Sequence, residues 1–386
     1  GAPYQLSPKA LLQQTLVSSG TMTNRIDRLV ERRLVERRTD PHEWSPPWSW
    51  VEQVAARIPR TAAKVAPGVP HELTPDGGCA TWTSVDGQLV EAREVGFDVE
   101  APLDATPTPN ADAVYFTGMS QESGGVLYKV GTAAKSEPVL IASGFIAPTS
   151  LVMATRGDTV YVSDLGLKDE GDANTPARPG GVVYSVPAAG GDPTPLAGTE
   201  GFGARSLDLV GGPDGDVLYF SGSNPDSGEA GVYRVLLGGG ALEVVTEGGD
   251  LRELSGIAVT ADGDIYVIDT IGSSGRGSLL KVSATGTVSE VVIGLRVGYP
   301  AGLALTRDES HALISGINIE KGSAQVYRVE LADPSFENIE VVDMGISQNT
   351  ESAGLHRAHT VDNYAWADSA TPGGVYLLGT RAKALP

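Results

Sequence analysis

The feature that most constrains the fold is a short strand-like motif that recurs six times over the last two thirds of the chain. Each copy has a small or polar residue, two or three strand formers, and then Tyr or Leu. The copies begin at Gly124, Gly180, Ala230, Gly277, Ala324 and Gly373. Their equivalent positions are Tyr128, Tyr184, Tyr233, Leu280, Tyr327 and Tyr376, which are 56, 49, 47, 47 and 49 residues apart. A near-constant period with several strands in each unit is typical of propeller blades.

Two further landmarks accompany each copy of the motif. A preceding strand ends at Gly118, Asp164, Gly222, Asp269, Gly316 and Asp368. An earlier apolar strand centres on Leu103, Leu151, Leu207, Ile257, Leu303 and Leu355. Turn sequences such as Pro213–Asp216 join these two strands. We therefore predict an all-β fold, a six-bladed β-propeller over residues 79–386, with strands A to D in each blade and the Tyr and Leu positions in the core.

The last unit poses a problem of closure, because it reaches Pro386 without a clear strand D. Upstream of the first unit lies an extra hairpin, Ala80–Val85 and Gln88–Val95, with Asp86-Gly87 between its strands. We predict that Leu89–Val95 supplies the outer strand of the sixth blade. This would close the ring and remove an exposed sheet edge.

The N-terminal segment differs from the rest in charge. Residues 1–66 hold 10 Lys and Arg against 6 Asp and Glu, a net of +4, whereas the whole chain carries −20. Ser7-Pro8 is a helix-start signal, and Met22, Ile26, Leu29 and Val30 are spaced as in a helix. A short strand over Leu34–Arg38 would follow. Two helices and a strand in this order indicate a winged helix-turn-helix.

Residues 5–42 closely resemble the DNA-binding core of MarR-type regulators. The resemblance implies a helix-turn-helix fragment over residues 1–42 whose DNA-facing residues would be Thr21, Thr23, Asn24, Arg25 and Arg28. The chain departs from the family after Asp40-Pro41, where Glu43–Trp50 replaces a basic wing. Residues 43–78 contain six prolines and are interpreted as a linker with a short helix near Val51–Arg57.

A second resemblance concerns the propeller. Leu254–Val288 resembles the NHL-repeat propellers and is similar to the six-bladed group of SMP-30/gluconolactonase and strictosidine-synthase-like proteins. This implies the fold, and it makes a metal-dependent lactonase or esterase one candidate activity. The gluconolactonase metal site uses Glu, Asn and Asp ligands at the starts of strand A, and no Asn stands there in this chain.

The loop-rich mouth of the propeller is the first candidate site. Asp164, Asp269 and Asp368 end strand B on alternate blades. They could hold Ca²⁺, since oxygen ligands suit that ion, or each could cap its own loop by accepting backbone N–H groups. The adjacent loops are expected to present four residues: Arg205, Ser255, Tyr299 and Glu351. The insert Gly166–Gly180 is a candidate lid or partner contact.

The central channel is the second candidate site. Asp104 and Asp208 directly follow the core Leu of strand A in blades one and three, so they are structural anchors or channel ligands. A His cluster, His356 and His359 with Arg357 between them, runs along strand A of blade six and is interpreted as core or turn structure.

Three functions remain open. The first is a non-catalytic propeller that binds a small molecule, glycan or protein on its loop-rich face, the second a Ca²⁺-dependent hydrolase, and the third a DNA-binding regulator with a propeller sensor. Nucleophile-elbow, P-loop, zinc and dinucleotide motifs are absent from the sequence, as is a membrane span of about 20 apolar residues. The acidic propeller would repel a phosphate backbone. Its composition favours an exported bacterial protein, whereas a working helix-turn-helix favours the cytoplasm.

Overall fold

A computed structural model describes most of the propeller and two short pieces before it. The described residues are 35–38, 51–54, 81–85, 88–96, 102–120, 123–132, 136–166, 181–272, 275–297, 300–318, 323–342, 354–368 and 374–380. The chain divides into two compact units, Gly1–His71 and Glu72–Pro386. The expected N-terminal helices and their five DNA-facing residues lie outside the described residues.

In the first unit, β1 (Val35–Arg38) pairs antiparallel with β2 (Val51–Val54). The strand expected near Leu34–Arg38 is confirmed as β1. The short helix expected from Val51 is wrong over Val51–Val54, where the backbone is extended. β-Branched residues favour a paired strand, and Val35 stands opposite Val54 in the register.

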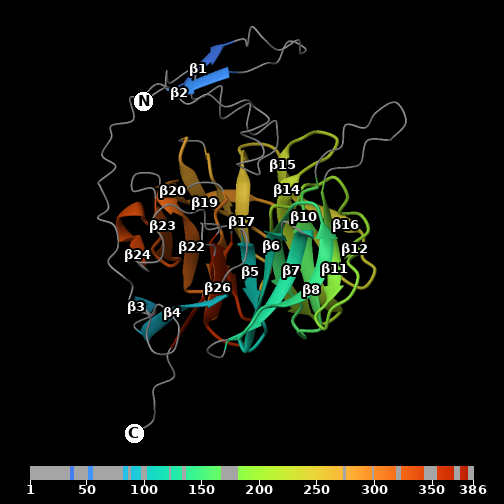
Figure 1. The fold of residues 1–386 in the computed structure, drawn as a ribbon. Coiled ribbons are helices and arrows are strands. Elements are labelled where there is room, and N and C mark those ends of the chain that lie inside the picture. Colours follow the sequence, from blue (N-terminus) through green and yellow to red (C-terminus); the bar gives the residue numbers. More distant parts are fainter. Residues whose placement is uncertain are drawn as a thin grey trace. The chain divides into compact units, whose positions relative to one another are not determined.

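The second unit is a six-bladed β-propeller, as the repeat predicts (Figure 1). Blade 1 has strands β5 (Pro102–Pro107), β6 (Ala113–Ser120), β7 (Gly124–Gly131) and β8 (Val139–Phe145). Blade 2 has β9 (Pro148–Met153), β10 (Thr159–Asp164), β11 (Val182–Pro187) and β12 (Thr194–Pro195). Blade 3 has β13 (Ser206–Gly212), β14 (Gly215–Ser223), β15 (Ala230–Leu236) and β16 (Leu242–Glu247).

The remaining blades follow the same order. Blade 4 has β17 (Leu254–Val259), β18 (Ile265–Asp269), β19 (Gly277–Val282) and β20 (Val288–Leu295). Blade 5 has β21 (Leu303–Leu305), β22 (His311–Asn318), β23 (Ser323–Glu330) and β24 (Glu340–Val342), with the 3-10 turn η1 (Phe336–Asn338) before the last strand. Blade 6 has β25 (His356–Arg357), β26 (Asn363–Asp368) and β27 (Gly374–Thr380).

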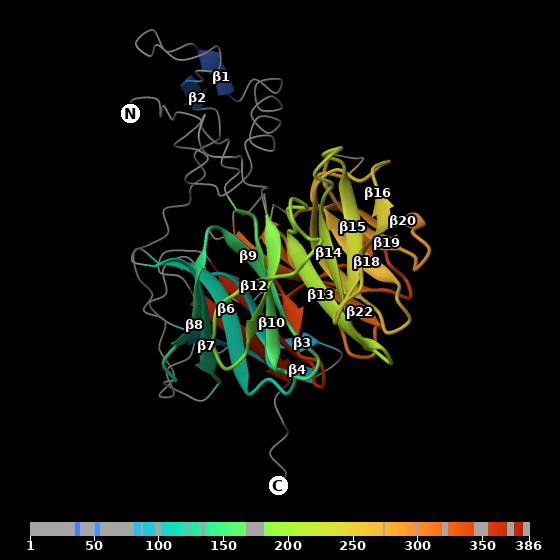
Figure 2. The same ribbon diagram turned by 90° about the vertical axis from the view of Figure 1, so that its right-hand side faces the viewer.

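Blade 6 is completed by the N-terminal hairpin, as predicted. The strand β4 (Gln88–Gly96) pairs antiparallel with β27, and β3 (Thr81–Val85) adds a fifth strand outside it. The inner strands contact one another in the cyclic order β5, β9, β13, β17, β21, β25 and back to β5. Figure 2 shows neighbouring blades side by side, with their inner strands toward the centre of the ring. The propeller therefore closes its ring by pairing a strand that precedes blade 1 with the last strand of blade 6.

The core lies between neighbouring blades. The six apolar residues at the centre of strand A are buried, from Leu151, Leu207 and Leu355 at 0% exposure to Leu103 at 8%. At the repeated strand-C position, Tyr233 is fully buried and stacks on Phe220, with ring centroids 5.3 Å apart. Tyr128 and Tyr184 are half-buried at the equivalent position. Within the described part of the chain, no helix has the length and apolarity needed to cross a membrane.

Candidate functional site

At the mouth, Asp164 ends β10 and is buried against its own blade. Its carboxylate accepts hydrogen bonds from the backbone N–H groups of Ile146 (2.8 Å), Ala147 (2.7 Å) and Gly166 (3.0 Å). The first two donors lie in the loop that enters the blade, and the third lies in the loop that follows β10. One side chain therefore fastens two loops that would otherwise have unpaired N–H groups.

Asp269 has the same role at the end of β18. Four backbone N–H groups, those of Arg252, Glu253, Ile271 and Gly272, donate to it at 2.9 to 3.1 Å. A carboxylate offers about four acceptor positions. Neither aspartate, as placed, has much coordination capacity left for a metal ion, and the Ca²⁺ site at the mouth stays a prediction.

The glycine at the end of strand B in blade 3 has a steric explanation. In blade 3 the carbonyl oxygen of Phe202 lies 2.6 Å from where a Cβ would stand on Gly222, so no side chain fits there. The N–H of Ser223 donates to that same carbonyl at 2.7 Å. In blades 2 and 4, by contrast, the loops turn N–H groups toward this position, and an aspartate accepts them.

Of the other residues expected at the mouth, Arg205 lies beside Glu253, a residue that the sequence did not single out. The guanidinium Nη1 of Arg205 lies 4.0 Å from Oε1 of Glu253, and both side chains are largely buried. Thr270 donates from its hydroxyl to Oε2 of Glu253 at 3.2 Å. Tyr299, Glu351, the side chain of Asp368 and insert residues 167–180 lie outside the described residues. The Ser255 hydroxyl instead joins blades 4 and 5, 2.8 Å from both the N and O atoms of Ala301.

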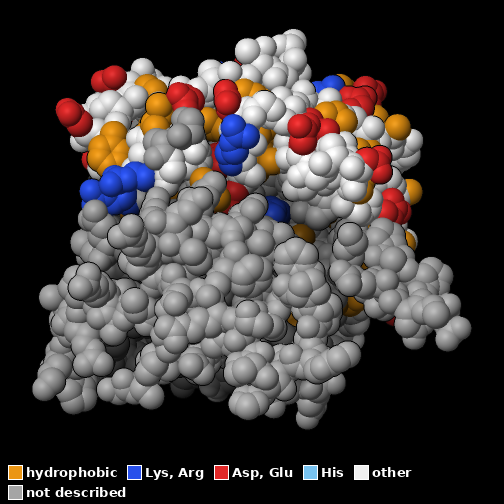
Figure 3. All heavy atoms as spheres, turned by 90° about the horizontal axis from the view of Figure 1, so that it is seen from above, with side chains coloured by type: hydrophobic (Ala, Val, Ile, Leu, Met, Phe, Trp, Pro, Cys, Tyr) orange, Lys and Arg blue, Asp and Glu red, His pale blue; other side chains and the backbone are white. Residues whose placement is uncertain are grey.

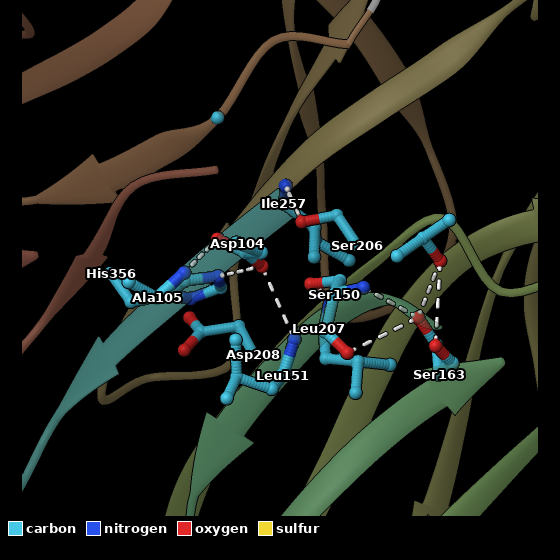
Figure 4. Close-up of polar contacts among 12 residues, drawn as sticks. Asp104, Ala105, Ser150, Leu151, Ser163, Ser206, Leu207, Asp208, Ile257 and His356 are labelled. Atoms are coloured by element: carbon cyan, nitrogen blue, oxygen red, sulfur yellow. Dashed lines mark hydrogen bonds and ion pairs between the residues drawn. The ribbon is translucent and has the colours of Figure 1, made fainter. Parts of the chain in front are cut away.

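The central channel contains a second polar system, which fastens each inner strand to the next. Strand A is an edge strand, so its N–H groups toward the axis have no partner in their own sheet. Ser150 accepts from the N–H of Leu207, and Ser206 accepts from that of Ile257, both at 3.3 Å. Figure 4 shows these side chains reaching across from one blade to the next.

At two blades aspartates take this role. Asp104 accepts from the N–H of Leu151 in blade 2 at 3.2 Å and from its neighbour Ala105 at 2.8 Å. Asp208 accepts from the N–H of Val259 in blade 4 at 2.7 Å and from its neighbour Leu209 at 2.8 Å. Both aspartates predicted beside the channel are therefore structural anchors between blades.

The structure also brings both histidines of the His cluster into this channel. His356 Nε2 lies 2.8 Å from Asp104 Oδ2, with both side chains buried. His359 Nε2 donates to the carbonyl of Met153, in blade 2, at 2.7 Å. Figure 4 shows Asp104, His356 and Asp208 side by side, although they come from three different inner strands.

Burial and charge shift the titration of this group. Burial would lower the pKa of His356, but the charge and hydrogen bond of Asp104, with the charge of Asp208, outweigh it and raise that pKa. Burial raises the pKa of Asp208, against its two backbone hydrogen bonds and the charges of His356 and His359. A cluster of this kind in a channel is a functional-site candidate on physical grounds.

Sequence reasoning found these residues singly but missed their association. Asp104 and His356 are 252 positions apart and meet through closure of the ring. One signal was present, because each of the three residues directly follows the core apolar residue of its inner strand. Blades 2, 4 and 5 have Val152, Ala258 and Ala304 at that position. Among the described residues, no group of three or more His, Cys, Asp or Glu side chains could hold a metal ion.

Comparisons with known proteins give one match for the N-terminal segment and several for the propeller fold. Residues 1–43 match the MarR family. A gluconolactonase from Xanthomonas campestris has a similar structure, with a TM-score of 0.55 and 12% identity over 82% of this chain and 98% of that one. A luciferin-regenerating enzyme has a TM-score of 0.49 and 12% identity over 76% and 95%. A putative TolB from Agrobacterium tumefaciens has a TM-score of 0.46 and 15% identity over 77% and 91%. No curated protein matches the sequence.

Proposed function

We propose that the propeller is a binding module that takes a small molecule, glycan or protein on its loop-rich face. The observation that carries this is the engagement of Asp164 and Asp269, which accept three and four backbone N–H groups. A hydrolase of the predicted type would need those carboxylates to hold Ca²⁺ and polarise a carbonyl. Moving them would leave the loop N–H groups unpaired, at roughly 1–3 kcal/mol for each buried group.

The same face offers groups for recognition. Arg205 and Glu253 come from neighbouring blades and lie 4.0 Å apart, and the partly exposed Arg205 is the one that a ligand seated between those blades would meet. On the face drawn in Figure 3, acidic and basic side chains of the described residues lie interspersed. A ligand with both polar and charged groups fits such a surface better than a polyanion does.

The first test separates binding from metal-dependent hydrolysis. The melting temperature of the full chain is measured with Ca²⁺, Mg²⁺, Zn²⁺ or EDTA, together with hydrolysis of glucono-δ-lactone. A metal that binds the folded form raises its melting temperature. We expect no shift and no hydrolysis above the buffer rate. A Ca²⁺-dependent shift with saturable hydrolysis, both lost in Asp269→Asn, would overturn the proposal.

The second test measures binding itself. The full chain is applied to a glycan array and to a peptide library, with Arg205→Gln as the matched variant. Binding that weakens at least tenfold in Arg205→Gln, with unchanged melting temperature, is the expected result. Equal binding by both proteins would remove the loop-rich face around Arg205 from the proposal.

A hydrolase remains the second candidate, because the gluconolactonase covers 82% of this chain at a TM-score of 0.55. A DNA-binding regulator is the third, because residues 1–43 match the MarR family. Fluorescence anisotropy of a random 30-base-pair duplex against the full chain tests it. Binding whose affinity falls steeply with salt and is lost in Arg25→Ala would favour the regulator.

A further inference from the structure

The joint between blade 6 and blade 1 pairs two titratable side chains, whereas at the other joints described around the channel a serine or aspartate side chain accepts a backbone N–H group. Ser150, Ser206 and Ser255 connect blades 2 to 3, 3 to 4 and 4 to 5 through hydroxyls, which do not titrate in the physiological range. Blade 6 instead meets blade 1 through the side chains of His356 and Asp104. The place where the ring closes is therefore held by a contact whose strength depends on protonation.

The surroundings fix this contact tightly. Asp104 is bound by the N–H groups of Ala105 and Leu151 as well as by His356, so one carboxylate touches blades 1, 2 and 6. A Cβ on Gly354 would collide with Asp104 Oδ1. Asp104 cannot turn away from His356 without breaking its hydrogen bonds to Ala105 and Leu151.

We propose that the Asp104–His356 contact is a pH-operated latch, in which protonated His356 holds blade 6 to blade 1 and its deprotonation loosens the closure of the propeller. The other charged groups around the pair are Asp208 on β13 and Arg357 and His359 beside His356. Arg357 donates to the carbonyls of Ala358 and His359. The inner strands of blades 2, 4 and 5 place Val152, Ala258 and Ala304 at the same level, so they add no charge there.

The direction of the switch follows from the raised pKa of His356. An unfolded histidine titrates near pH 6.5, so the latch contributes fully below about that pH. Its contribution is lost as the pH rises through the higher folded value. The device therefore tightens as the pH falls and loosens as the pH rises through the folded pKa of His356. Because β4 is part of blade 6, loosening also reaches the strand that comes from the N-terminal end of the chain.

Hydrogen exchange locates the effect. Exchange of the full chain is followed by mass spectrometry from pH 5.5 to 9, corrected for the intrinsic pH dependence of the amide rate. Peptides covering residues 102–107 and 354–358 should lose protection relative to the reference across this range, because deprotonation of His356 weakens the contact that joins them. Strand C of blade 4, residues 277–282, which is not one of the inner strands, serves as the internal reference and should not change. Equal loss of protection in both places would overturn the latch.

A pair of variants separates the latch from ordinary packing. His356→Gln keeps an amide donor toward Asp104 but cannot titrate, so its melting temperature should lie below that of the wild type in acid and approach it in base. His359→Gln is the control, because His359 bonds a neutral carbonyl in the same channel. A wild-type-like pH dependence in His356→Gln would refute the proposal.

If His356→Gln does not fold, the wild type still decides the matter. The chain has 5 histidines, few enough to follow their ring signals by NMR. The signal of His356 is assigned by eliminating the others with single substitutions of His42, His71, His311 and His359. Titration above pH 6.5 is expected, and titration at or below that value would contradict the latch.

Discussion

Aspartates lie both in the central channel and in the turns between strands A and B. Comparison of the two sets shows how burial reverses the effect that similar hydrogen bonds have on the pKa of a carboxylate. In the channel, Asp208 accepts two backbone N–H groups at 2.7 and 2.8 Å, yet burial raises its pKa. In the turn of blade 5, the exposed Asp308 accepts from Ser310 and Thr306, and these bonds lower its pKa to about 2.

Asp112, in the corresponding turn of blade 1, behaves like Asp308. The hydroxyl of Thr108 donates to it at 2.6 Å, and this bond is the main reason why its pKa is lowered. Hydrogen bonds favour the charged carboxylate, whereas desolvation disfavours it, and the balance depends on the depth of the group. The channel should therefore stabilise the protein in acid, and the turns should stabilise it toward neutral pH.

The largest effect is expected from Asp104→Ala, which removes the channel carboxylate that three groups share. It leaves the buried His356 without its counter-charge and two N–H groups unpaired. Breaking a buried ion pair by removing one partner costs about 3–5 kcal/mol. Urea unfolding at pH 6 measures this loss, with Asp112→Ala as the turn counterpart. Equal losses in the two variants would remove the distinction between channel and turn.

The next largest effect should come from Gly354→Ala. The added methyl group would overlap the Asp104 carboxylate, and overpacking of this kind costs about 1–3 kcal/mol. Gly131→Ala is the control, because there the new Cβ would meet the Ser136 hydroxyl at 2.9 Å, a side-chain atom that can move. Thermal unfolding of both variants compares them. A Gly354→Ala protein as stable as Gly131→Ala would show that the channel is less tightly packed than described.

Asp208→Asn tests the sign of the channel effect. A raised folded pKa gives stability below the unfolded value, near 3.9, and this stability is lost as the pH rises through the folded value. The asparagine cannot ionise, although it has one acceptor fewer for the two N–H groups. Relative to the wild type, the variant should therefore gain stability between pH 4 and 8, by about 1.4 kcal/mol for each unit of the wild-type shift. Urea titrations across this range measure the gain, and a constant difference would contradict it.

The sequence predicted those features that depend on neighbouring residues or on a repeat. The spacing of the repeat predicted the six units, and the strand and turn patterns within each unit predicted its strands. The extra hairpin upstream of the first unit predicted the origin of the closing strand β4. The capping role of Asp164 and Asp269 was one of two alternatives that their position allowed. The reason for glycine at position 222 was not predictable, because it depends on the carbonyl oxygen that the neighbouring loop turns toward that position.

The channel cluster was beyond prediction for a different reason. Asp104, Asp208 and His356 lie on inner strands of blades 1, 3 and 6, and their proximity depends on how six blades arrange around the axis. Local patterns showed that each follows a core residue, which fixes its level in the channel. They did not show which side chains meet there, because that depends on the closed ring.

The smallest effect is expected at the turns, with Asp308→Asn. Above about pH 4 the carboxylate is charged in both states and its bonds to Ser310 and Thr306 stabilise the fold, and this contribution is lost as the pH falls toward the folded pKa of about 2. Because Asp308 is exposed, solvent screening keeps its value below about 1 kcal/mol. The variant should therefore lie slightly below the wild type at pH 5 and converge with it near pH 2. If the variant instead gained stability over the wild type as the pH rose from 2 to 5, the turn carboxylate would behave like Asp208. Burial would then not be what separates the two regions.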